Sequence, residues 1–141
     1  MIAVDTHVLL AAHRGEHPKH EKALARLREV AEGGAPWGLP VFCVGEFLRV
    51  ATHAKIFTPP TRPEVALEFI DRLLESPGLR LLLPTERFWK HLRAAVEAGD
   101  VRGNLAFDAQ IAAVCEEHGA RELITGDRDF SRFPALQPQF L

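Results

Sequence analysis

Acidic residues at four widely separated positions could act together on a metal ion. Asp5 directly follows a short apolar run at the start of the chain, and Asp127 follows a second such run. Glu46 and Asp108 lie within stretches whose apolar residues recur at helical spacing. Asp5 taken alone is equally well explained as a helix cap, so the prediction depends on the four acids considered together.

Asp108 is the acid that is hardest to explain structurally. Three, four and seven residues later come Ile111, Ala112 and Cys115, which place Asp108 on the apolar face of its predicted helix. An ionised carboxylate that faces the interior costs several kcal/mol unless it is paired. No basic residue lies three or four positions away on either side. A bound cation would supply the missing charge, and a distant arginine is the alternative.

Glu46 poses the same question less sharply. Phe42 and Val50 lie four residues to either side of it, but Arg49 is three residues away and could form a simple surface pair with it. For Glu46 alone the surface pair is the simpler interpretation. The case for a site therefore depends on whether this residue converges with the aspartates.

Convergence of these carboxylates would itself require a cation. Two carboxylates about 5 Å apart repel by roughly 3 kcal/mol at an effective dielectric of 20. Such a cluster must either take up protons or hold a metal. Oxygen ligands select hard cations, Mg²⁺ or Mn²⁺, over zinc. A cation of this kind, held by acids at a sheet edge, is suited to phosphodiester hydrolysis.

The elements that position these acids alternate between strand and helix. The apolar patterns predict strands at 2–4, 37–39, 79–83 and 122–125, with a short edge strand within 135–141. They predict helices from residue 6 and at 17–32, 41–54, 64–75, 85–99 and 104–118, the last capped by Asn104. Intervening helices make hairpins impossible, so we expect an α/β fold with a parallel sheet and helices on both faces. In such sheets, ligands bind beyond the carboxyl ends of the strands.

Composition sets the broad class. A chain of 141 residues, with 47% hydrophobic and 26% charged residues, predicts a single globular domain over 1–141. The net charge of −2 argues weakly against a protein that coats nucleic acid. Two cysteines, Cys43 and Cys115, exclude a disulfide scaffold and lie among apolar residues, as core thiols do. With no predicted membrane span or signal peptide, we expect a cytoplasmic protein.

Other chemistries fit less well. A phosphoaspartyl phosphatase of the haloacid dehalogenase type needs a second aspartate where His7 stands, and a receiver domain needs a lysine later than Lys90. His13, His17 and His20 have ligand-like spacing for zinc, but Pro18 interrupts their helix and surface histidines are the simpler explanation.

Four motifs, in order, resemble those of PIN domains, and the total length is similar to that of the VapC toxins of toxin–antitoxin pairs. They are Val4-Asp5-Thr6-His7, Glu46-Phe47-Leu48-Arg49-Val50, Asn104-Leu105-Ala106-Phe107-Asp108-Ala109-Gln110-Ile111-Ala112 and Thr125-Gly126-Asp127-Arg128-Asp129-Phe130. Each motif is weak alone, but four in order form a strong signal. The resemblance covers essentially the whole chain. It implies a three-layer α/β/α fold with a central parallel sheet.

The resemblance also implies an activity: a Mg²⁺- or Mn²⁺-dependent endoribonuclease, inhibited by a cognate VapB antitoxin and homodimeric. The alternative is a PIN-like binding module that has lost catalysis, against which the full set of acids argues. By this resemblance the catalytic and metal-binding acids would be Asp5, Glu46, Asp108 and Asp127, with Asp129 able to assist or replace the last. Hydroxyls that orient the carboxylates would come from Thr6 and Thr125. Apart from the resemblance, Arg49 and Arg128 are candidates for phosphate contact because they lie near these acids in the sequence, with solvated surface positions as the alternative. His7 stands where the family often has asparagine.

Overall fold

A five-stranded parallel sheet forms the centre of the computed structural model, which describes residues 1–141. The strands, in chain order, are β1 (Ile2–Val4), β2 (Trp37–Pro40), β3 (Leu79–Leu82), β4 (Glu122–Thr125) and β5 (Gln137–Phe140). Their order across the sheet is β3-β2-β1-β4-β5, and every neighbouring pair is parallel. The predicted parallel sheet is confirmed, and the C-terminal segment does supply its edge strand.

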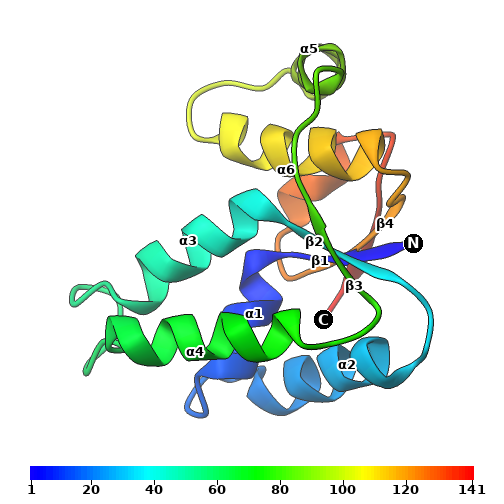
Figure 1. Ribbon diagram of the computed structural model, residues 1–141. Coiled ribbons are helices and arrows are strands. Elements are labelled where there is room, and N and C mark those ends of the chain that lie inside the picture. The colour runs from blue at the N-terminus through cyan, green and yellow to red at the C-terminus, as the bar shows by residue number, and fades with distance from the viewer.

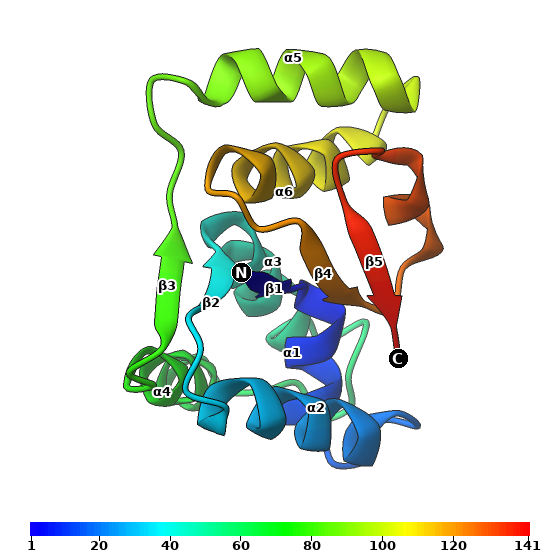
Figure 2. The same ribbon diagram turned by 90° about the vertical axis from the view of Figure 1, so that its right-hand side faces the viewer.

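Helices cover both faces of this sheet. They are α1 (Thr6–His13), α2 (His20–Glu32), α3 (Val41–Ala51), α4 (Pro63–Leu74), α5 (Phe88–Gly99) and α6 (Leu105–Glu117), and a 3-10 turn, η1 (Arg128–Arg132), follows β4. On one side α6 lies next to the sheet with α5 stacked outside it, and α1, α2 and α4 lie on the other side (Figures 1 and 2). The three-layer α/β/α architecture is therefore as expected. No helix is long and apolar enough to cross a membrane.

The core lies between these layers and is built mainly from the central strands and from α1 and α6. β1 and β4 are fully buried except at their first residues, which suits the near-continuous apolar composition of inner parallel strands. Five consecutive residues of α6, Ile111 to Cys115, are buried, because this helix has the sheet on one side and α5 on the other. Cys43 and Cys115 are both buried free thiols, as predicted.

Two helices begin later than the sequence predicts. The helix expected from residue 17 begins at His20, because the proline after His17 disfavours helical backbone at that residue. The helix expected from Thr85 begins at Phe88. There the Thr85 hydroxyl accepts a hydrogen bond from the backbone N–H of Arg87 at 3.2 Å, a local turn that competes with the helix.

The predicted cap of α6 is also wrong in detail. Asn104 occupies the residue before the helix, but its backbone is already helical and its side chain makes no capping hydrogen bond. Its amide is therefore free for other contacts.

Candidate functional site

Three adjacent strands bring the predicted acids to one edge of the sheet. Asp5 directly follows β1, and Asp127 follows its neighbour β4 after one intervening glycine. β2, on the other side of β1, runs directly into α3, which carries Glu46. Asp108 lies in the first turn of α6. The carboxyl ends of the central strands and the start of α6 thus define one site.

Asp5 is held at the base of this site by donors from three segments. Its side chain is 3% exposed. Oδ1 accepts from the backbone N–H of Thr6 at 2.7 Å and faces the Cys43 thiol at 3.8 Å, while Oδ2 accepts from the Thr125 hydroxyl at 2.7 Å. Burial raises the pKa of Asp5, and the hydrogen bonds from Thr125 and Thr6 oppose that rise.

Three other aspartates form a close cluster. Asp108, Asp127 and Asp129 each offer a carboxylate oxygen, and these oxygens lie within 4.8 Å of one another. Burial and, after it, the negative charges of Asp127, Asp5, Glu46 and Asp129 together raise the pKa of Asp108 to about 7. Arg132 Nε lies 3.7 Å from Asp129 Oδ1, but neither Asp108 nor Asp127 has an ion-pair partner. A divalent cation would neutralise their negative charge.

The turn after β4 fixes part of this cluster. The Thr125 hydroxyl that donates to Asp5 also accepts from the backbone N–H of Asp127 at 3.0 Å. Asp127 in turn caps η1, because its Oδ1 accepts from the backbone N–H of Asp129 at 2.9 Å. One hydroxyl thus links two of the acids. Thr6 differs, since its backbone N–H rather than its hydroxyl contacts Asp5, and that buried hydroxyl has no hydrogen-bond partner.

Glu46 lies outside the close cluster but within its electrostatic reach. Burial and then the charge of Asp5 raise the pKa of Glu46, while the Arg49 guanidinium lowers it. No ion pair within 4.0 Å joins Glu46 to Arg49. The simple surface pair considered from the sequence therefore does not form in that geometry.

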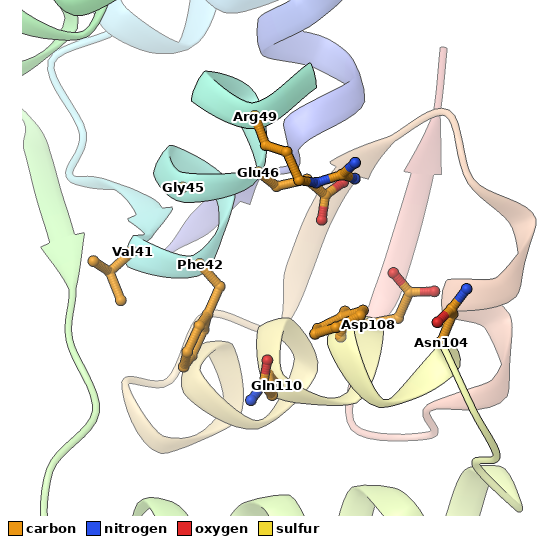
Figure 3. Close-up of a pocket in the computed structure, with 9 residues that line it drawn as sticks. Val41, Phe42, Gly45, Glu46, Arg49, Asn104, Asp108 and Gln110 are labelled. Atoms are coloured by element: carbon orange, nitrogen blue, oxygen red, sulfur yellow. The ribbon is translucent and has the colours of Figure 1, made fainter. Parts of the chain in front are cut away.

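A groove of about 790 Å³ opens between α3 and α6 beside these acids. Figure 3 shows Glu46 and Arg49 on α3 and Asp108 on α6, with their polar ends directed into the space between the helices. The remaining lining residues are Val41, Phe42, Gly45, Asn104, Phe107 and Gln110. For Asn104 the sequence favours a cap over a contact with substrate. Residues 104, 107 and 110 are three apart in the sequence, and this spacing indicates that their side chains could lie on one side of a helix.

The two arginines expected to meet substrate are placed differently. Arg49 lines the groove. Arg128 lies outside it, with its guanidinium carbon 4.7 Å from the centre of the Phe140 ring, a cation–π contact with the edge strand.

The histidines considered as zinc ligands have separate partners. His13 hydrogen-bonds to Thr61, and His20 bonds the backbone oxygen of Ala11. Neither joins His17 in a cluster of ligand atoms. The structure thus provides no support for the zinc interpretation.

Comparisons with known proteins agree with this arrangement. The family model for the PIN domain matches residues 2–136. Ribonuclease VapC43 of Mycobacterium tuberculosis is 37% identical over 137 residues, which are 97% of this chain and 92% of that protein.

Solved structures support the same fold. The chain matches VapC20 of M. tuberculosis, a sarcin-ricin loop cleaving toxin, with a TM-score of 0.69, 20% identity and coverage of 98% of this chain and 100% of that chain. It matches a chain of VapBC2 from Rickettsia felis, solved with a promoter DNA fragment, with a TM-score of 0.68, 19% identity and coverage of 99% and 98%. The chain therefore belongs to the PIN-domain family and, within it, to the VapC ribonucleases.

Proposed function

We propose that this chain is a divalent-metal-dependent endoribonuclease, a VapC-type toxin that hydrolyses RNA phosphodiester bonds. The observation that carries the proposal is the cluster of Asp108, Asp127 and Asp129, whose carboxylate oxygens lie within 4.8 Å of one another. The VapC relatives, which are named as ribonucleases, support RNA as the substrate.

The donor set at this site fits Mg²⁺ or Mn²⁺. All the candidate ligands are carboxylates, and hard cations prefer oxygen. Asp5, Glu46, Asp108 and Asp127 would hold the cation, and Asp129 could assist or replace Asp127. When bound, such a cation neutralises charge that develops on the reacting phosphate and acidifies water.

Each residue around the acids has a separate task. Thr125 orients Asp5 through its hydroxyl and holds the backbone of Asp127. Thr6 orients Asp5 through its backbone N–H. Arg49, which lines the groove, binds a phosphate of the RNA backbone, because a guanidinium matches phosphate oxygens well. Hydrolysis adds water across one P–O bond, so one product ends in a phosphate and the other in a hydroxyl.

The partners follow from the family. A cognate VapB-type antitoxin would bind the toxin and inhibit it, and the toxin would form a homodimer. Solved VapBC assemblies from Rickettsia felis and Salmonella typhimurium support the antitoxin partner. Residues 1–141 would act as one PIN-like domain in the cytoplasm.

The experiment that tests this proposal is cleavage of a structured RNA by purified protein free of antitoxin. Cleavage should occur with Mg²⁺ or Mn²⁺ and should stop with EDTA or with Asp5→Asn. Cleavage that persists in EDTA would contradict the metal-dependent mechanism. A protein that binds no metal at all would instead favour the inactive binding module.

A further inference from the structure

The groove between α3 and α6 contains more than the acids. Phe107 precedes Asp108 on α6, lines the groove and is 59% exposed. Its ring takes part in none of the aromatic pairs of the chain. An exposed, unpaired aromatic side chain directly beside a cluster of candidate metal ligands has no packing role within the chain.

The opposite wall of the groove contains a glycine that packing does not require. Val41, Gly45 and Arg49 are spaced by four residues along α3, so they lie on one stripe, and all three line the groove. A Cβ built on Gly45 would meet nothing within 4 Å. Glycine inside a helix is unfavourable relative to alanine. Gly45 therefore keeps open a space that a larger residue would fill.

Polar groups complete the groove. Asn104, the residue before α6, and Gln110, on α6, lie three residues to either side of Phe107, and both line the groove. Figure 3 shows the amides of Asn104 and Gln110 on the α6 side and the Arg49 guanidinium on the α3 side. The groove thus offers a flat apolar ring, amide donors and acceptors, and one positive charge.

We infer that this groove binds an unpaired nucleobase of the RNA next to the phosphate that is cut. The inference rests on the proposed ribonuclease function and extends it to the substrate. The base stacks on Phe107 in the space left by Gly45, its edge meets the amides of Asn104 and Gln110, and a backbone phosphate meets Arg49. A base already stacked within a duplex cannot enter, so the enzyme selects single-stranded segments.

Binding can be measured separately from cleavage. The probe is a single-stranded RNA oligonucleotide that contains 2-aminopurine, whose fluorescence falls when the base stacks. Ca²⁺ replaces Mg²⁺, and gels establish that the RNA stays intact. Phe107→Ala should weaken binding about tenfold or more and abolish the quenching, and Phe107→Trp should restore both. Gly45→Leu, which fills the space, should weaken binding similarly. The same sequence in a duplex should bind more weakly and show no quenching.

The control is Trp89→Ala. Trp89 is also an exposed aromatic residue, at 65%, but it does not line the groove. This variant should bind and cleave as the wild type does. All variants should retain the wild-type Mn²⁺ affinity and circular dichroism spectrum, which would show that the acids and the fold are intact.

The outcomes separate the inference from the proposed function. Quenching that depends on Phe107, in a protein that cuts no RNA, would support the base-binding groove and contradict the ribonuclease function. Metal-dependent cleavage with unchanged binding and KM in Phe107→Ala and Gly45→Leu would overturn the groove and leave the ribonuclease standing. If Phe107→Ala left RNA binding intact but changed the oligomeric state or antitoxin affinity, the groove would be a protein interface, and the inference would be wrong.

Discussion

Replacing Asp108 by asparagine should make the metal-free protein more stable while abolishing cleavage. Asn has nearly the same shape as Asp but cannot ionise. Burial and, after it, the negative charges of the neighbouring acids raise the pKa of Asp108 to about 7, and the neutral amide of asparagine is subject to neither penalty. The predicted gain measures how much the ionised carboxylate of Asp108 destabilises the folded protein before a cation binds.

The size of the gain in stability follows from the raised pKa of Asp108. A rise from 3.8 to about 7 corresponds to about 4 kcal/mol of unfavourable free energy for the ionised form. Asp108 is only half-buried, so solvent screening reduces this to about 2 kcal/mol. For a chain of 141 residues, that difference raises the melting temperature by about 7 °C.

The stability of the wild type should depend on pH. Because the folded state holds the proton of Asp108 more tightly than the unfolded state does, wild-type stability falls as pH rises from about 4 to about 7. The raised pKa values of Asp5 and Glu46 act in the same direction. The advantage of Asp108→Asn should thus be small at pH 4.5 and largest at pH 8.

Thermal melts in EDTA at these two pH values test the prediction. Asp71→Asn, at an exposed aspartate of α4 outside the site, is the matched control and should change neither melt. Adding Mg²⁺ at pH 8 should stabilise the wild type, by about 2.7 kcal/mol at one hundred times the dissociation constant, and should stabilise Asp108→Asn much less. A variant no more stable than the wild type at pH 8, or a gain that does not vary with pH, would refute the reasoning.

Three further predictions concern single contacts. Thr125→Val removes the hydroxyl that donates to Asp5 Oδ2, so RNA cleavage should fall about 10- to 100-fold. Thr125→Ser should restore most of the cleavage. A Val variant with full activity would contradict the role of this hydroxyl in orienting Asp5. Asp127→Asn should reduce cleavage more than Asp129→Asn, because Asp127 is fixed by two backbone hydrogen bonds whereas Asp129 is exposed; the reverse order in kcat would make Asp129 the fourth acid. Phe47→Ala, in the fully buried core, should lower the unfolding free energy in urea by about 3–5 kcal/mol, and a loss under 1 kcal/mol would show that the core relaxes around it.

The sequence predicts the parts of this molecule that depend on local pattern. The strand before Asp5 is readable because a buried parallel strand is apolar throughout. Asp108 is conspicuous because a carboxylate on an apolar helical stripe needs a partner. Both signals require only neighbouring residues.

Contacts between segments that are distant in the sequence cannot be predicted from local patterns. Cys43 faces Asp5 only because β2 pairs beside β1, and no local pattern specifies that pairing. The sequence predicts Phe107 as an ordinary apolar residue of α6. The packing of α3 against that helix places it beside the groove. The start of α5 was misjudged for a related reason, since the turn at Thr85 competes with a helix that the apolar spacing permits.

Asp5 and Asp127 each lie directly before a helical segment as its N-cap, where the side chain accepts a hydrogen bond from a backbone N–H. Asparagine performs that task about as well as aspartate. A single Asp→Asn change at either position can therefore abolish cleavage without destabilising the turn that the residue caps. Such a chain would escape the cellular machinery that removes unfolded proteins. It would accumulate like the active form and compete with it for the same binding partners. Inactivation by such a change would therefore yield a folded competitor of the active protein and not a degraded one.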